Sequence, residues 1–361
     1  MMKRLRILFV WTSVSLLLQF GAYSLLNYQV EKVMEPQAVS SEPITSQLKT
    51  TIPSSDLENV QISYAKEYLA YLDNGTLRIY NFKKKKVIFE SPSANNISLG
   101  VLAYQWLPDR NTLLYFYADK NSNSGNSQTT ELYTLELPSS NEDTEPDNRL
   151  NQTVKFPAGG KIEELVVSTS TNLMYFTVKK GSTEQLMEID VMKNVRTLNK
   201  TGESIDNMVA SDQHGTLYID SNVGSTRTVI AFDAGKRKLI SRNNYDKILG
   251  IRGGKVYLGE VKNNELVKIK SITDRSNMSD SPSLKTEWTG SIPFEDAHAL
   301  VGAKSQVIVY NDQMAYIVTA GLLKEVQLSG DQNYVSEDGA ELIRLSRQGT
   351  STLVELQPLN K

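Results

Sequence analysis

The chain has 361 residues, and its 39 Lys and Arg against 41 Asp and Glu give a net charge of −2 at pH 7. A general nucleic-acid-binding protein would be expected to lean basic, so this balance argues against one. The chain has no cysteine, which excludes disulfide bonds, thiol catalysis and thiolate metal ligands. Its two histidines, His214 and His298, are too few for a three-histidine zinc site.

The N-terminus predicts a membrane anchor. Residues 1–6 form a basic tip that includes Lys3, Arg4 and Arg6, and residues 7–26 are uncharged and mainly apolar. As a helix that rises about 1.5 Å per residue, the second segment would span roughly 30 Å, the thickness of a bilayer core. Because basic flanks stay in the cytoplasm, we predict a single-pass signal-anchor helix at 7–26, with the body of the chain on the extracytoplasmic side of the cell membrane.

A cleaved signal peptide is the alternative interpretation of this segment. Ala22-Tyr23-Ser24 has the small-x-small pattern of a cleavage site, but the apolar run continues through Leu25 and Leu26 and is long for a signal peptide. Both interpretations export the rest of the chain, whereas a third, a buried core helix, does not. No cysteine follows the segment, so a bacterial-type lipid anchor is excluded.

Residues 27–57 are predicted to be a polar tether. The segment contains Pro36, Pro43 and Pro53 together with two serine pairs. A flexible coil of about 25 residues reaches on the order of 25–30 Å, so the tether would keep the remaining domain, residues 58–361, near the membrane.

The domain at 58–361 repeats a unit of four short strands. Its clearest copy has apolar runs at 162–168, 173–179, 185–190 and 195–200, separated by turn-sized gaps. Such a unit is typical of four antiparallel strands joined by hairpins. The first strands of successive units begin near residues 60, 101, 162, 205, 246, 297 and 333.

This spacing predicts an all-β fold, a seven-bladed β-propeller of four-stranded antiparallel blades. Most intervals approach the 40–50 residues of such blades once the polar insertions at 138–152 and 273–285 are removed. Six blades are the alternative. The seventh unit lacks a fourth strand, and a ring must close to bury its first and last faces. We therefore expect Ile44–Leu48, or a neighbouring part of the tether, to supply that strand.

Several turns between first and second strands carry a recognisable motif. The clearest is Trp106–Tyr115, W-L-P-D-R-N-T-L-L-Y; a second is Val335–Ile343, V-S-E-D-G-A-E-L-I, and weaker copies occur at Ser211–Tyr218 and Tyr64–Tyr71. They resemble the W-S-P-D-G-x-x-I-A-F signature of TolB-like and WD40-like propeller repeats. The resemblance covers roughly residues 60–357. It implies a propeller of the kind that serves as a protein-docking platform, and it assigns no binding or catalytic residue.

The histidines and their neighbours are the first candidates for chemistry. We interpret His214, in an Asp-Gln-His-Gly turn, as a solvated turn residue rather than a catalytic or metal-binding one. Glu295, Asp296 and His298 would hold a divalent cation if they approached a central channel. Calcium would need further oxygen ligands, which the sequence does not reveal, so no metal and no cofactor is predicted.

Charged runs are the remaining candidates. Glu163-Glu164 and Glu142–Glu145 are interpreted as a strand edge and a solvated loop. Lys83–Lys86 is interpreted as a solvated hairpin turn that discourages strand pairing, with contact to anionic lipid or cell-wall polymer as the alternative. The polar stretches 119–130 and 138–152 are expected to be insertion loops on different faces of the propeller.

The predicted function is that of a non-enzymatic, membrane-anchored extracytoplasmic platform or sensor for a protein or an envelope polymer. Anchoring would raise the effective concentration of membrane-bound partners. No catalytic, cofactor-binding or metal residue is assigned, and no nucleic acid is expected as a partner. The alternative is a carbohydrate-active enzyme, a glycoside hydrolase or lyase with paired carboxylates on the propeller scaffold.

Overall fold

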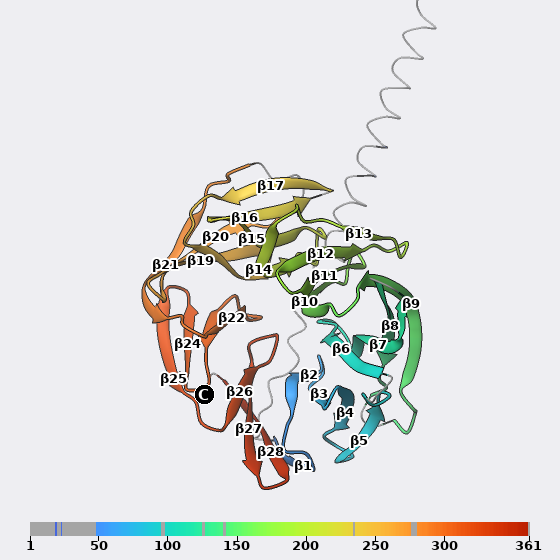
Figure 1. Cartoon of the computed structure of the whole chain (residues 1–361). Helices are drawn as coiled ribbons and strands as arrows, with labels where there is room; N and C mark the ends of the chain where they lie inside the picture. The colour runs from blue at the N-terminus through green and yellow to red at the C-terminus, as the bar shows by residue number, and fades with distance from the viewer. Residues whose placement is uncertain are drawn as a thin grey trace, which may run out of the picture. The chain divides into compact units, whose positions relative to one another are not determined.

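The computed structural model describes residues 48–94, 98–124, 127–139, 142–233, 235–275 and 280–359, together with Gln19 and Tyr23. The described part of the unit Ser40–Lys361 forms seven four-stranded antiparallel sheets arranged as blades around a centre (Figure 1). The predicted seven-bladed, all-β propeller is therefore confirmed, and the alternative of six blades is wrong.

Six blades are built from consecutive strands, with the first strand of each nearest the centre (Figure 1). In blades 1 to 3 the strands are β2 (Glu58–Ile62), β3 (Tyr68–Asp73), β4 (Thr76–Asn81) and β5 (Lys86–Glu90); β6 (Ser98–Trp106), β7 (Thr112–Ser124), β8 (Ser127–Glu136) and β9 (Asp147–Pro157); and β10 (Lys161–Ser168), β11 (Leu173–Lys180), β12 (Thr183–Ile189) and β13 (Val195–Thr197). In blades 4 to 6 they are β14 (Glu203–Ala210), β15 (Leu217–Val223), β16 (Thr226–Asp233) and β17 (Lys236–Ser241); β18 (Asp246–Arg252), β19 (Lys255–Lys262), β20 (Glu265–Thr273) and β21 (Lys285–Pro293); and β22 (His298–Val301), β23 (Val307–Tyr310), β24 (Met314–Thr319) and β25 (Leu322–Gln327).

The seventh blade joins the two ends of the described ring. It contains β26 (Gln332–Val335), β27 (Glu341–Gln348) and β28 (Ser351–Pro358), and its outer strand is β1 (Leu48–Ile52). Strand β1 pairs antiparallel with β28, so that Leu48 lies opposite Leu356 and Ile52 opposite Thr352. The ring-closing strand thus lies next to the predicted position 44–48, of which residues 44–47 are outside the described residues.

The hydrophobic core lies between blades. The cluster shared by blades 7 and 1 includes Ile52, Leu69, Tyr71, Ile343 and Val354, all at most 1% exposed. The second strands are apolar on both faces because each is covered by a neighbouring blade on either side. A single blade therefore cannot bury its own faces, and the sequence is stable only as a complete ring.

Two predicted insertion loops are shorter than expected, which corrects the sequence analysis. The stretch 119–130 is mostly strand, since β7 continues to Ser124 and β8 begins at Ser127; the stretch 138–152 overlaps β9, which begins at Asp147. Strand β8 lies between β7 and β9, and Ser127 pairs with a residue on each side. Hydrogen bonds on both sides stabilise an extended backbone even where the side chains are polar.

The predicted anchor at 7–26 lies outside the described residues, apart from Gln19 and Tyr23. Within the described ranges, the chain contains no helix with the length and apolar character needed to cross a bilayer. The anchor and the domain boundaries on the N-terminal side of Leu48 therefore stay predictions.

Ring closure by β1 is tested by replacing Ile52, which is fully buried, with alanine. Ile52→Ala removes packing between blades 7 and 1 and should lower the free energy of unfolding by about 2–4 kcal/mol. Thr51→Ala, at an exposed position of the same strand, should change it by about 0.5 kcal/mol or less. Thermal denaturation of both variants measures the difference, and equal midpoints would contradict a packed β1.

Candidate functional site

The direction of the strands defines two faces of the propeller. Within each blade, the turn between the first and second strands and the turn between the third and fourth strands lie on the same face, because the strands alternate in direction. Strand β1 runs opposite to β28, so Leu48 also lies on this face. We call it the proximal face, since residues before Leu48 join the ring there, and we call the other the distal face.

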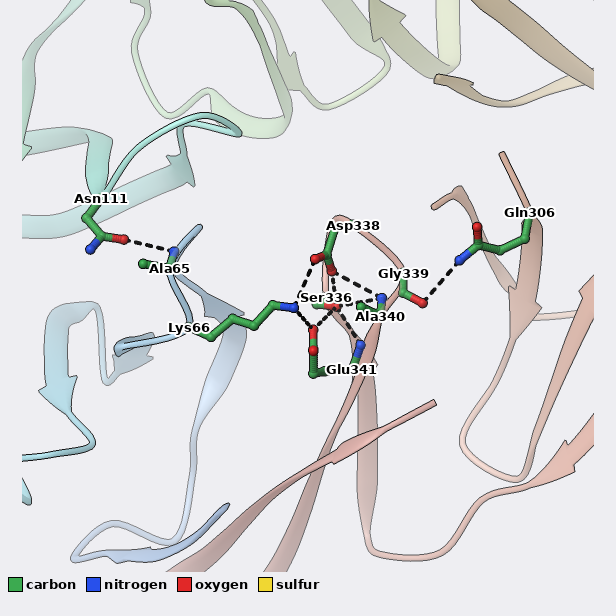
Figure 2. Close-up of polar contacts among 9 residues, drawn as sticks. All are labelled: Ala65, Lys66, Asn111, Gln306, Ser336, Asp338, Gly339, Ala340 and Glu341. Atoms are coloured by element: carbon green, nitrogen blue, oxygen red, sulfur yellow. Dashed lines mark hydrogen bonds and ion pairs between the residues drawn. The ribbon is translucent and has the colours of Figure 1, made fainter. Parts of the chain in front are cut away.

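A buried ion cluster on the proximal side links blade 7 to blade 1, as Figure 2 shows. The Lys66 ammonium lies 3.0 Å from Asp338 Oδ2 and 2.5 Å from Glu341 Oε2, and the side chains of Lys66 and Glu341 are 4% and 0% exposed. The Ser336 hydroxyl donates to Asp338 Oδ1 at 2.6 Å and accepts the Glu341 N–H at 2.9 Å. The Asp338 carbonyl also accepts the N–H of Ala303 from blade 6 at 2.7 Å. The V-S-E-D-G turn therefore connects three blades.

Other turns with the predicted motif connect neighbouring blades in the same way. Asn111, at the end of the W-L-P-D-R-N segment, accepts the Ala65 N–H at 3.1 Å and donates to Glu67 Oε2 at 3.0 Å (Figure 2 shows the first bond). Asp212 accepts the Thr169 N–H at 3.0 Å, which joins blades 3 and 4. The turns that resemble WD40-like repeats are thus used for contacts between blades.

His214 belongs to one of these turns. Its backbone N–H donates to Ser211 Oγ at 3.0 Å, and its side chain is half-buried. The Ser211 hydroxyl donates to Asp274 Oδ2 at 2.5 Å, and the Tyr218 hydroxyl donates to Asp274 Oδ1 at 2.7 Å. Because Asp274 follows the third strand of blade 5, this network joins blades 4 and 5. His214 takes part in this network through its backbone N–H.

The possible cation site at Glu295, Asp296 and His298 does not form. All three residues are exposed, and the His298 ring lies against the ring of Tyr310 with centroids 5.4 Å apart. Across the described ranges, no three Asp, Glu or His side chains converge closely enough to hold a metal ion.

Five charged residues from four blades influence one another on the proximal face. Desolvation raises the pKa of Glu337; Arg252 opposes the shift, and the negative charges of Asp212 and Asp338 add to it. Burial likewise raises the pKa of Asp212, with Asp109 adding and Arg252 opposing. First-strand turns of blades 2, 4, 5 and 7 therefore form one electrostatic unit.

The acidic pair Glu163-Glu164 lies within β10, the innermost strand of blade 3 and an edge strand of its sheet, as predicted. Glu164 accepts the N–H of Met208 in blade 4 at 3.2 Å. Asp220 accepts the N–H of Ile248 in blade 5 at 3.0 Å with each of its oxygens. Both contacts satisfy inner-strand backbone groups close to β-bulges. These carboxylates connect successive blades.

Burial is the main cause of an unusual pKa in both groups. It raises the pKa of Glu164 to about 8 and that of Asp220 to about 7, against the opposing effect of the backbone N–H groups they accept. The charges of Asp220 and Glu184 add to the shift of Glu164, so these side chains of blades 3 and 4 lie within electrostatic reach of one another.

The tetralysine turn and the acidic loop of the neighbouring blade interact. The Lys84 ammonium lies 2.8 Å from the Glu142 carbonyl and 2.9 Å from Asp143 Oδ1. The hydrogen bond from Lys84 and its positive charge lower the pKa of Asp143. Lys83, Lys85 and Lys86 are exposed on the proximal face. Because Asp143 is fully exposed, this contact is screened by solvent and orients the loop more than it stabilises the fold.

Exposed apolar side chains occur at turns of the same face. Val191 and Met192, between β12 and β13, are 63% and 76% exposed, and Leu322, the first residue of β25, is 76% exposed. None of these three side chains was predicted to be functional. A signal was present, because Val191 and Met192 occupy a turn-sized gap between strands, where polar residues are usual.

A depression on the distal face is the remaining candidate. It has a volume of about 460 Å³ and lies between blades 7 and 1. Its walls are mainly polar and it is open to solvent; the residues that line it are Ser55, Leu57, Asp331, Gln332, Leu345, Arg347 and Thr352. Sites for small molecules are usually enclosed and mostly apolar, so this depression does not have their character.

Comparisons with known proteins show the fold. No protein-family model matches the chain, and no curated protein sequence matches it. The structure is similar to the β-propeller domain of Cps50 (Swd1) from Myceliophteria thermophila, with a TM-score of 0.55 and 12% identity over 85% of this chain and 98% of that one. It is also similar to Raptor from Chaetomium thermophilum, with a TM-score of 0.52 and 11% identity over 93% of this chain and 32% of that one.

The chain therefore spans about a third of the length of that second structure. At these identities the likeness shows the fold alone. The molecule is a seven-bladed β-propeller, as the strand periodicity predicted. The resemblance of its turns to TolB-like and WD40-like repeats stays a prediction.

The ion cluster is tested by Lys66→Met, which leaves Asp338 and Glu341 buried without their cation. Breaking a buried ion pair on one side should lower the free energy of unfolding by about 3–5 kcal/mol. Lys304→Met, at an exposed site in the equivalent turn of blade 6, should change it by about 0.5 kcal/mol or less. Chemical denaturation provides the measurement. Similar effects of the two substitutions would show that this cluster does not stabilise the fold.

The buried carboxylate of Glu164 predicts a pH dependence. A carboxyl with a raised folded-state pKa contributes stability below its unfolded pKa of 4.5, and this is lost as the pH rises through about 8. Glu164→Gln keeps the oxygen that accepts the Met208 N–H and cannot ionise. The melting temperature of Glu164→Gln minus that of wild type should therefore be larger at pH 8 than at pH 5. Glu163→Gln, at the exposed neighbour, should show no such trend, and a matching trend would contradict the assignment.

Proposed function

We propose that the protein is a non-enzymatic platform or sensor, held at the extracytoplasmic side of a membrane, that binds a protein or an envelope polymer. One observation carries this proposal: the polar residues best suited to chemistry in the described ring are used to join blades. Lys66, Asp338 and Glu341 connect blades 7 and 1, and Glu164 and Asp220 accept backbone N–H groups from the next blade. What remains free is a rigid ring with exposed turns, which suits docking.

Membrane attachment rests on the N-terminal sequence. Residues 7–26 are long and apolar enough to cross a bilayer, and the basic tip at 1–6 favours a cytoplasmic N-terminus. Residues 27–47 would then connect the membrane to Leu48 on the proximal face. As a flexible coil they reach about 25 Å, so the ring would stay close to the membrane and to membrane-bound partners.

A carbohydrate-active enzyme is the second candidate. The raised pKa of Glu164, about 8, is a property of general acids in glycoside hydrolysis, and Asp220 lies within its electrostatic reach. Against this role, Asp220 is 1% exposed and both of its oxygens accept the Ile248 N–H. A substrate would have little access to that carboxylate.

Cell fractionation tests the platform. The full chain should sediment with membranes and resist extraction by alkaline carbonate, and deletion of residues 7–26 should release it. Because the chain has no cysteine, Ser225→Cys on the exposed β15–β16 turn offers one labelling site. A membrane-impermeant maleimide should label it in intact cells once any outer barrier is permeabilised. Full-length protein in the cytosolic soluble fraction would contradict the proposal.

Turnover separates the two candidates. The purified protein should leave a panel of envelope polysaccharides and glycosides unchanged while it binds one envelope component with saturation. Hydrolysis or elimination that is lost in Glu164→Gln and retained in Glu163→Gln would overturn the platform in favour of the enzyme.

A further inference from the structure

Exposed apolar side chains of the ring gather on the proximal face. Eight large apolar side chains are highly exposed in the described part of the ring, and two of them, Val223 and Tyr245, lie on the distal face. Of the other six, Val191 and Met192 lie in a proximal turn, and Leu150, Val195, Leu322 and Leu323 lie in the proximal halves of the fourth strands that follow such turns. Scattered exposed apolar residues are ordinary, but their concentration on one face of a monomer marks an interaction surface.

These residues and the lysines occupy equivalent positions around the ring. The turn between the third and fourth strands and the first residue after it include Lys83–Lys86 in blade 1, Val191-Met192 in blade 3 and Leu322 in blade 6. The three turns are two, three and two blades apart in a ring of seven. They therefore surround the centre and lie at a similar height, which suits contact with a flat surface.

The chain joins the ring beside the lysine turn. The Thr50 hydroxyl of β1 lies 2.6 Å from the Tyr80 hydroxyl of β4, the strand that leads into Lys83–Lys86. Strand β1 therefore contacts blade 1 close to this turn. Lys84 forms an ion pair with Asp143, whereas Lys83, Lys85 and Lys86 are exposed. The exposed Glu142 and Glu145 nearby reduce the net positive charge of this region.

We infer that the proximal face rests on an anionic lipid bilayer, with the apolar turns of blades 3 and 6 in the interfacial region and the exposed lysines of blade 1 at lipid phosphates. The inference rests on the proposed membrane attachment of residues 7–26. Apolar side chains beside basic ones are the combination that binds bilayer interfaces, and each lysine near such a surface strengthens binding about five-fold. The distal face is then left open to partners.

Depth-dependent fluorescence quenching tests this orientation in the full chain. Met192→Cys and Leu322→Cys place a single environment-sensitive dye on the proximal face, and Val223→Cys places one at an exposed apolar site of the distal face. Each protein is reconstituted into vesicles of phosphatidylcholine alone or of phosphatidylcholine with phosphatidylglycerol. The lipids carry nitroxide quenchers at defined depths.

Both proximal dyes should be quenched by shallow nitroxides and shift to the blue, while the distal dye should not. Quenching should increase with phosphatidylglycerol, fall with added salt, and weaken when Lys83, Lys85 and Lys86 are replaced by glutamate. Equal quenching on the two faces, or none on either in floating proteoliposomes, would overturn the inference and leave the proximal face to a protein partner. Failure of the full chain to float with vesicles would instead refute the anchor itself.

Discussion

The whole structure depends on the pairing of β1 with β28. Each blade buries its faces against its neighbours, so the energy of the fold is distributed around a circle and an open ring would expose two apolar faces. The segment Leu48–Ile52 completes the last blade and packs Ile52 into the interface with blade 1. The buried contact of Lys66 with Asp338 and Glu341 lies at the same junction. An apolar seam and an ionic seam thus hold together the two ends of the described chain.

The antiparallel pairing of β1 with β28 also determines the face of the ring on which Leu48 lies. Because β1 runs antiparallel to β28, the residues before Leu48 join the ring on the face that carries the first-strand turns. The exposed Val191, Met192 and Leu322 lie on the same face of the ring.

The periodicity of apolar runs was enough to predict the architecture. First strands expected near 246 and 297 begin at Asp246 and His298, because alternating burial and turn chemistry are local properties. The polar stretch 119–130 was misjudged as a loop, since its strand structure comes from ladder bonds to β7 and β9 and not from its own side chains. Backbone hydrogen bonds to strands on both sides thus outweighed the low preference of these polar residues for β structure.

The site residues were harder to predict for a related reason. The motif turns at Trp106 and Val335 were recognised, but their contacts join blades, and a contact such as Lys66 with Asp338 becomes visible only when the ring is closed. Glu164 was placed at a strand edge, but its hydrogen bond with Met208 of the neighbouring blade could not be predicted from the sequence of one strand.

Amide hydrogen exchange at the ring junction tests this account most directly. If β1 closes the ring, the amides of residues 48–52 should exchange as slowly as those of β28 at 351–358, because the two strands would open only together. Exchange of 48–52 at the rate of an unstructured peptide, with 351–358 still protected, would show a ring that closes without this strand and would contradict the account.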